Sequence, residues 1–204
     1  MNLLIDEVPT TVIIDDVEFE INSDFRISMM FELLINDPEL SERERLYQAL
    51  ILYYPIIPSN LEAAVDKIMW FYKCGKEEEE KEENNNTSKP TGKSTMRIYD
   101  YEHDSEIIFA SFMKSYGINL QRDNLHWWEF KSLFDNIDED SKLYKIMEIR
   151  SVNLNQIKDK DKKNYYKKMK DLYKLPDNIS KSEKEKLDEL GKMLLVGEDI
   201  TSLL

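Results

Sequence analysis

The residues of this chain that could bind a metal ion lie in one acidic cluster. His103 is flanked by Glu102 and Asp104, and Glu106 follows two residues later. Imidazole and carboxylate groups are common zinc ligands. Adjacent residues on a helix point in different directions, however, so this spacing does not predict a metal site. Carboxylates also offset the positive end of a helix dipole, and we attribute the cluster to that effect.

Neither a catalytic site nor a nucleotide-binding loop can be assembled from the sequence. The chain has 41 acidic residues, so pairs of carboxylates arise by chance. Of the two histidines, neither His103 nor His126 stands beside a cysteine or a plausible serine nucleophile, and we interpret His126 as a packing or capping residue. Residues 92–95 read Gly-Lys-Ser-Thr like the end of a phosphate-binding loop, but that pattern needs a glycine where Thr87 stands. We therefore expect no cofactor, and an enzyme is the weakest hypothesis.

The acidic composition narrows the class of protein further. The 41 acidic residues exceed the 28 basic ones, which gives a formal charge of −13. A general nucleic-acid binder needs a surplus of lysine and arginine to neutralise phosphates. No apolar run approaches the ~20 residues of a membrane span. The start of the chain lacks the basic and apolar segments of a signal peptide, and the single cysteine, Cys74, excludes an intramolecular disulfide. We expect a soluble cytoplasmic protein that binds neither nucleic acid nor membrane.

A helix at residues 125–134 is the element around which we expect the core to form. Its aromatic residues Trp127, Phe130 and Phe134 recur at helical spacing. Aromatic side chains bury more area than any others, so this helix should dominate a small core. Burial in the core is the favoured interpretation of these residues. In the alternative interpretation, Trp127, Trp128 and Phe130 anchor a binding partner.

The first region, residues 1–75, should hold a β-hairpin followed by three helices. Two apolar runs at residues 10–21 flank an Asp-Asp turn and indicate the hairpin. A lone hairpin is marginal in water, so it needs cover from helices or from a third strand at residues 3–5. Capping boxes at residues 41–44 and 59–62 predict the starts of two of the helices.

The chain then changes in composition. Residues 76–96 are acidic and polar and lack any apolar residue before Met96, so we expect a disordered linker. Residues 97–204 should form a second helical region, which ends in an amphipathic helix at 180–196. The fold class predicted from these patterns is mainly α: a multi-helix bundle with a small N-terminal β-hairpin and a long disordered acidic linker.

A predicted helix at residues 158–174 reverses the charge of the chain. It contains eight lysines against three aspartates, a local charge of +5. Aromatic residues are interleaved at helical intervals, so a nucleic-acid contact is one interpretation. Because the other residues together carry about −18, we favour docking on the acidic part of the same protein or on an acidic partner. The candidate partner-binding residues here are Tyr165, Tyr166, Lys167, Lys168 and Lys170.

Several blocks of residues resemble a known family. They are residues 99–104 (Tyr-Asp-Tyr-Glu-His-Asp), 107–112 (Ile-Ile-Phe-Ala-Ser-Phe), 116–120 (Tyr-Gly-Ile-Asn-Leu), 125–130 (Leu-His-Trp-Trp-Glu-Phe) and 145–150 (Lys-Ile-Met-Glu-Ile-Arg). With a Trp-Phe-Tyr-Lys-Cys-Gly block at residues 70–75, they are similar to the gene-product-fifteen family of bacteriophage tail-region proteins. The likeness covers roughly residues 1–176.

The resemblance implies a function that the residues alone do not. Such a protein is expected to be a non-enzymatic tail assembly chaperone of a phage or prophage, acting in the bacterial cytoplasm. Its expected partners are phage tail proteins, namely the tape-measure protein and the tail-tube protein, and it could also form a homo-oligomer. The alternative is a structural component that is retained in the phage tail. The family supplies no catalytic residues to carry over to this chain.

Overall fold

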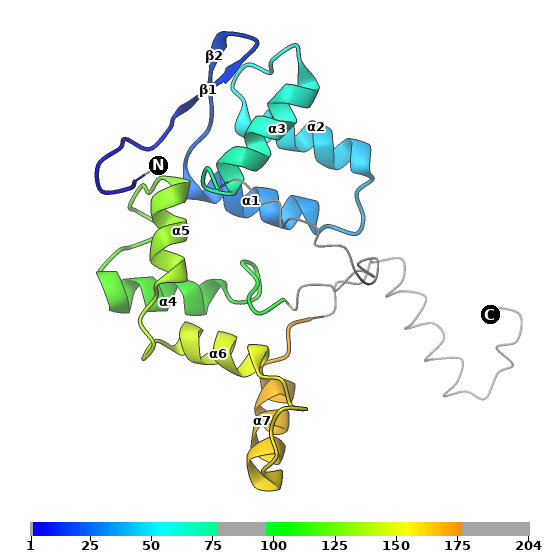
Figure 1. Cartoon of the computed structure of the whole chain (residues 1–204), viewed down its shortest axis with the longest axis vertical. Coiled ribbons are helices and arrows are strands. Elements are labelled where there is room, and N and C mark those ends of the chain that lie inside the picture. Colours follow the sequence, from blue (N-terminus) through cyan, green and yellow to red (C-terminus); the bar gives the residue numbers. More distant parts are fainter. Residues whose placement is uncertain (1, 77–96, 177–204) are drawn as a thin grey trace, which may run out of the picture.

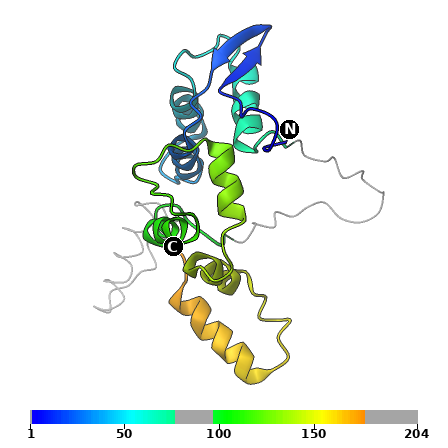
Figure 2. The same ribbon diagram turned by 90° about the vertical axis from the view of Figure 1, so that its left-hand side faces the viewer.

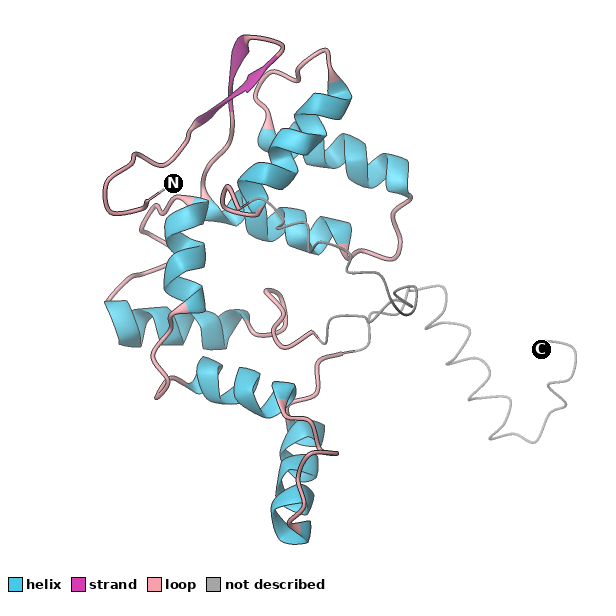
Figure 3. Ribbon diagram, in the orientation of Figure 1, coloured by secondary structure: helices cyan, strands magenta, loops and turns pink. Residues whose placement is uncertain are grey.

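The computed structural model describes residues 2–76 and 97–176, which form a β-hairpin and seven helices (Figures 1 and 3). The elements are β1 (Thr11–Ile14), β2 (Val17–Glu20), α1 (Phe25–Ile35), α2 (Glu42–Tyr53), α3 (Leu61–Tyr72), α4 (Ser105–Tyr116), α5 (Trp127–Asp135), α6 (Lys142–Ser151) and α7 (Lys160–Leu172). This confirms the predicted mainly α fold with an N-terminal hairpin. The predicted linker beyond Lys76 and the predicted helix at 180–196 lie outside the described residues.

The hairpin forms where the two apolar runs predict it. β1 and β2 pair antiparallel, with Val12 opposite Phe19. Asp15 and Asp16 make the turn, both with positive φ, as a tight two-residue hairpin turn requires. Aspartate adopts this left-handed conformation more readily than most residues. Val12 and Ile14 of β1 are buried, and β1 packs against α3.

The cover of the hairpin comes from helices, and the suggested third strand is wrong. Residues 3–5 form a turn whose Leu4 and Ile5 side chains are exposed. The side chain of Val17 in β2 is also exposed although it pairs with the buried Ile14, whereas Ile21 just after β2 is buried. Along β1, successive side chains point to opposite faces, and the Ile13 side chain is exposed between two buried neighbours, so one face of the hairpin meets the helices and the other meets solvent.

Local capping explains where the first helices start. The Asp24 carboxylate accepts a hydrogen bond from the Arg26 N–H and caps α1. The predicted capping box between Ser41 and Glu44 is present at the start of α2. The second predicted box is wrong, because α3 is capped by Asn60, whose side-chain oxygen accepts from a backbone N–H three residues later.

Helix α5 is the centre of the core, as its aromatic spacing predicts. Trp127 and Phe130 are completely buried, and Phe134 is nearly so. The Phe130 ring stacks on Phe25 of α1 with 4.8 Å between the ring centroids, and on Phe112 of α4 with 4.9 Å. α5 therefore joins the N-terminal helices to the C-terminal ones, and it lies between them in Figure 2.

Backbone contacts also join the regions on either side of residues 77–96. The Phe25 N–H donates to the Leu125 carbonyl at 3.1 Å, and the Trp127 N–H donates to the Ser23 carbonyl at 2.8 Å. These two bonds cross between the start of α1 and the start of α5. Buried residues from both regions belong to one hydrophobic core.

His126 caps α5, which confirms the capping interpretation. Its Nδ1 accepts from the Trp128 N–H at 3.0 Å, and the Glu129 carboxylate accepts from the His126 N–H at 3.0 Å. Because Nδ1 accepts, the proton of the neutral ring lies on Nε2, which donates to the Pro9 carbonyl at 2.9 Å. One imidazole thereby joins the N-terminal segment to the central helix.

A buried ion pair fixes α6 against the start of α4. Asp104 is 1% exposed and Arg150 is 6% exposed. Arg150 Nη2 donates to Asp104 Oδ1 at 2.9 Å, while Nη1 donates to the Ile98 carbonyl and Nε to the Tyr173 carbonyl. Asp104 makes no side-chain capping bond to α4. The partner of this carboxylate is a guanidinium 46 residues away, so the ion pair adds to the helix dipole, whose effect on the acidic cluster stays a prediction.

Candidate functional site: an apolar cleft between α1 and α4

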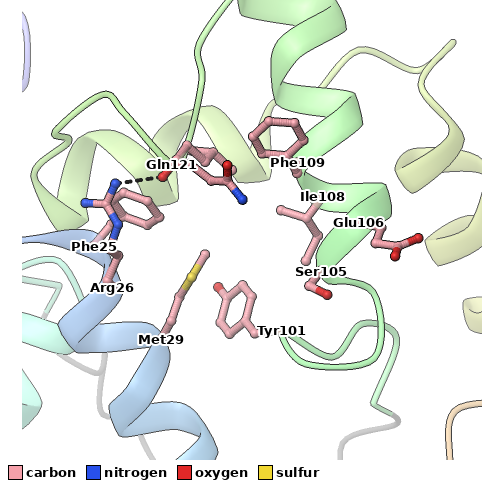
Figure 4. Close-up of a pocket in the computed structure, with 10 residues that line it drawn as sticks. Phe25, Arg26, Met29, Tyr101, Ser105, Glu106, Ile108, Phe109 and Gln121 are labelled. Carbon is pink, nitrogen blue, oxygen red and sulfur yellow. Dashed lines mark hydrogen bonds between the residues drawn. The ribbon is translucent and has the colours of Figure 1, made fainter.

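The stacking around Phe130 sets α1 and α4 apart and leaves an apolar cleft between them. The cleft has a volume of about 410 Å³. Its lining is mostly aromatic and aliphatic, with polar groups at the rim. The lining residues are Phe25, Arg26, Met29, Tyr101, Ser105, Glu106, Ile108, Phe109, Leu120 and Gln121. Figure 4 shows Met29, Tyr101 and Ile108 directed toward the same space.

The shape of this cleft is fixed by Arg26 at its rim. Arg26 Nη2 donates to the Leu120 carbonyl at 2.7 Å, a bond drawn in Figure 4, and to the Asp123 carbonyl at 3.1 Å. Its Nη1 donates to the Asp24 carboxylate at 2.8 Å. The guanidinium also lies over the Phe25 ring, 4.5 Å from its centroid. These contacts hold α1 against the segment between α4 and α5, so the cleft is preformed.

The Tyr101 hydroxyl is a buried polar group of the cleft that makes no hydrogen bond of standard geometry to the described residues. Tyr101 is 6% exposed, and the neighbouring Tyr99 hydroxyl interacts with it without satisfying that geometry. Burial raises the pKa of Tyr101 far above its usual range, so the hydroxyl keeps its proton and can donate. A buried donor without an acceptor costs about 1–3 kcal/mol. A ligand acceptor in the cleft recovers part of that cost only if the surrounding side chains move and uncover the hydroxyl.

The side chains that line this cleft suit the binding of an apolar ligand. They are apolar or neutral apart from Arg26 and Glu106 at the rim, and Arg26 is already paired.

Elsewhere, burial raises the pKa of the Cys74 thiol to about 11, which keeps it from acting as a thiolate at neutral pH. In residues 2–76 and 97–176, no group of three or more His, Cys, Asp or Glu side chains could hold a metal ion. Within the same ranges, no helix is long and apolar enough to cross a membrane.

The three sequence candidates on α5 lie beneath the surface. Trp127 and Phe130 are fully buried and Trp128 is 2% exposed. Both indole N–H groups are satisfied, Trp127 by the Tyr72 carbonyl at 2.8 Å and Trp128 by the Phe71 carbonyl at 2.7 Å. Their favoured interpretation as core residues is therefore confirmed. Their role in binding a partner stays a prediction, and in this conformation they would act by supporting the surface above them.

The other five sequence candidates all lie on α7. Tyr165 is 56% exposed and its ring meets Tyr166 edge to face, with 5.4 Å between the centroids. Lys167 and Lys168 are exposed, whereas Lys170 is half-buried and donates to the Arg150 carbonyl at 2.7 Å. The structure thus brings these five together on one helix but places them on a different element from the aromatic group of α5. Their binding role also stays a prediction.

The cleft could not be predicted from the sequence. Met29 of α1 and Phe109 of α4 pack in part against the core, and both also line the open space. Tyr101 stands in a block that carries the family resemblance, but its unpaired hydroxyl is a property of the packed molecule. A cleft depends on which faces of two helices stay apart, and α1 and α4 are separated by more than 60 residues.

Comparison with known proteins places the chain in a family. Residues 4–175 match the family model described as bacteriophage Gp15 protein. This range includes every helix and strand described above, and thus the cleft and α7 together. No curated protein matches the chain, and no solved structure does.

Proposed function

Because the chain belongs to the bacteriophage Gp15 protein family, we propose that it is a non-enzymatic chaperone of phage tail assembly. In this role it binds apolar segments of the tape-measure protein or the tail-tube protein before those proteins are packed into the tail. The observation that supports this proposal is the preformed apolar cleft between α1 and α4. Family membership supplies the phage context, and the cleft supplies a surface for contact.

The cleft suits a helical guest. An amphipathic helix presents large apolar side chains on one face at intervals of three or four residues. A space of about 410 Å³ has room for only a few such side chains. Methionine at the rim adapts to different guests because its side chain is unbranched and polarizable. If the guest displaces the side chains that bury it, the Tyr101 hydroxyl would donate to a carbonyl or a side-chain oxygen of the guest.

The net charge of −13 fits the same role. A protein that holds an aggregation-prone partner must keep the complex soluble, and a net charge far from zero does so. The competing explanation is that the charge serves only the solubility of the protein itself. Binding experiments on the cleft separate these two explanations.

The decisive experiment compares Met29→Gln with Met30→Gln during co-expression with the tape-measure protein of the same phage. Met29 lines the cleft, whereas its neighbour Met30 is exposed on another side of α1. We expect Met29→Gln to reduce the soluble, co-purifying tape-measure protein and Met30→Gln to leave it near the wild-type amount. If wild-type protein yields no complex and does not change the solubility of the tape-measure protein, the chaperone function is refuted.

Tyr101→Phe gives a second test, in which stability should rise while partner binding weakens. Removing the unpaired hydroxyl should raise the free energy of unfolding by about 1 kcal/mol, because the buried donor no longer lacks an acceptor. The same substitution should weaken partner binding, because the guest then loses its hydrogen bond. Urea denaturation measures the first effect and co-purification the second. Lower stability together with unchanged binding would contradict the role given to Tyr101.

The alternative is a structural component that stays in the tail. Mass spectrometry of purified phage particles distinguishes the two functions, because a chaperone leaves before the tail is complete. We expect the protein to be absent from finished particles. Its presence at a fixed ratio to the tail-tube protein would favour the structural component instead.

A further inference from the structure

Helix α7 extends away from the core and leaves most of its surface in solvent. In Figures 1 and 2 it reaches beyond α6 at one end of the molecule. It has 13 residues, none of which is buried. An isolated helix of this length is marginal in water, and most helices owe their stability to packing. α7 is therefore an element that its own chain supports only in part.

The support that α7 does receive is concentrated at its ends. Asp159 caps its N-terminus by accepting from the Lys162 N–H at 2.7 Å. Near the other end, Arg150 Nε donates to the Tyr173 carbonyl at 2.7 Å and Lys170 Nζ donates to the Arg150 carbonyl at 2.7 Å. These bonds hold the helix at a fixed angle, and the side with Tyr166 and Met169 is half-buried while the other sides stay exposed.

The charge of α7 is not neutralised by the part of the chain that the structure describes. Lys162, Lys163, Lys167 and Lys168 are exposed, and none of them forms an ion pair with residues 2–76 or 97–176. Lys163 and Lys167 stand four residues apart, where like charges on a helix repel. The suggested docking of this helix on the acidic part of its own protein therefore does not occur within these ranges.

One side of α7 combines this charge with apolar groups. Tyr165, Lys168 and Leu172 are spaced by three and four residues, so they lie along one side of the helix. Tyr165 is 56% exposed and Leu172 is 69% exposed. Lys162 lies one turn before Tyr165 on the same side. We call these four residues the lysine–apolar stripe.

We propose that the lysine–apolar stripe of α7 is a second binding site, separate from the cleft, whose ligand is an acidic amphipathic helix of another protein. Charge complementarity selects the acidic partner, because Lys162 and Lys168 form no ion pair with the described residues. The exposed Leu172 favours a protein over a nucleic acid, because a leucine side chain neither pairs with phosphate nor stacks on a base. A second copy of the chain also has an acidic surface, and the experiments below distinguish it from another protein as the ligand.

The proposal is tested with the full-length chain and two synthetic peptides. One is an 18-residue amphipathic peptide of leucine and glutamate with leucine at helical spacing, and the other has glutamine in place of glutamate. Fluorescence anisotropy measures the binding of each peptide at low and at high salt. We expect the acidic peptide to bind, the neutral one to bind at least about tenfold more weakly, and high salt to remove most of the difference.

Matched charge variants locate the binding. Lys162→Gln with Lys168→Gln should weaken binding of the acidic peptide about tenfold, and Leu172→Ala should weaken it further. The control is Lys114→Gln with Lys142→Gln, which makes the same change in net charge at exposed lysines outside α7. This control and Met29→Gln in the cleft should leave binding unchanged. Far-UV circular dichroism checks that α7 is retained in each variant.

Three results would overturn the proposal. Equal loss of binding in both lysine double variants would mean that the peptide senses net charge alone. Tighter binding of a duplex DNA probe than of the peptide, lost in the α7 variant, would assign the stripe to nucleic acid. A dimer of the wild-type protein in sedimentation, abolished by the α7 variant, would assign it to a second copy of the chain.

Discussion

Replacing Arg150 by methionine should destabilise the protein more than any surface substitution. Methionine approximates the length of the arginine stem but has no charge and no donors. Asp104, which is 1% exposed, would then keep a buried charge without its guanidinium partner. The carbonyls of Ile98 and Tyr173 would also each lose a donor. The substitution therefore leaves the Asp104 charge with the Asp100 N–H as its remaining donor and removes a donor from each of the two carbonyls.

The size of the effect follows from this burial. Breaking a buried ion pair by removing one partner typically costs about 3–5 kcal/mol, because the remaining charge cannot be solvated. An exposed pair contributes only about 0–1 kcal/mol. Since both partners here are at least nine-tenths buried, we expect Arg150→Met to lose about 4 kcal/mol of unfolding free energy. That is a large share of the roughly 5–15 kcal/mol of a typical domain.

Urea denaturation followed by tryptophan fluorescence provides the assay. The chain contains three tryptophans, and Trp127 and Trp128 are buried beside the core rings, so unfolding should change their emission. With a denaturant dependence of about 2 kcal/mol per molar urea, the midpoint should fall by about 2 M. Amide hydrogen exchange should also become faster at the C-terminal end of α7, where Arg150 holds the Tyr173 carbonyl.

A double substitution identifies the cause. Arg150→Met combined with Asp104→Leu removes both charges and should recover much of the lost stability, because an apolar pair replaces the buried ions. A loss below about 1 kcal/mol for Arg150→Met alone would refute the reasoning, since the pair would then behave like an exposed one. A double variant no more stable than Arg150→Met would show that the carbonyl contacts, and not the ion pair, carry the energy.

Three further predictions concern the central helix and its surroundings. Burial lowers the pKa of His126 below 6.5, so the unfolded chain takes up the proton first, and the unfolding free energy falls as pH falls below about 6.5. His126→Asn keeps a capping acceptor and should flatten this dependence in urea melts between about pH 7.5 and 5.5. An unchanged slope would contradict the prediction. Gly75→Ala should lower the free energy of unfolding by about 2–3 kcal/mol, because φ is +68° and a Cβ would lie 2.9 Å from the Trp128 ring. The control Gly117→Ala, with φ +69° and open space around it, should lower it by about 1 kcal/mol. Equal losses would show that the Trp128 ring moves aside at little cost. Trp127→Ala should lose about 3–5 kcal/mol in the same melts, and a stable variant that loses only its partner would make Trp127 an interface anchor.

The position of the elements was largely encoded in local sequence. The Ser41–Glu44 box, the Asp15–Asp16 turn and the aromatic spacing of α5 act over three or four residues, and the structure has all of them. A local signal also gave a wrong prediction where two neighbouring residues could both cap a helix. Asn60 caps α3 instead of Ser59, because either side chain suits a cap and the backbone path decides between them.

What the sequence could not supply was the pairing of distant residues. Any of 41 acidic residues could have paired with Arg150, and the packing of α4 on α6 selected Asp104. The sequence predicted that helices or a third strand would cover the hairpin, and only the structure shows that a helix covers β1 and that residues 3–5 form a turn.

The two proposed binding surfaces differ in how much of each could be predicted from the sequence. The charge and apolar pattern of α7 are properties of the sequence, and only the structure shows that nothing in the described ranges buries them. The cleft depends on the structure altogether. Phe130 holds α1 and α4 apart through two stacked rings, and the unpaired Tyr101 hydroxyl exists only because packing removed it from water without supplying an acceptor. Periodicity fixes which residues of a helix share a face, whereas the contacts of that face depend on chain segments far away in the sequence.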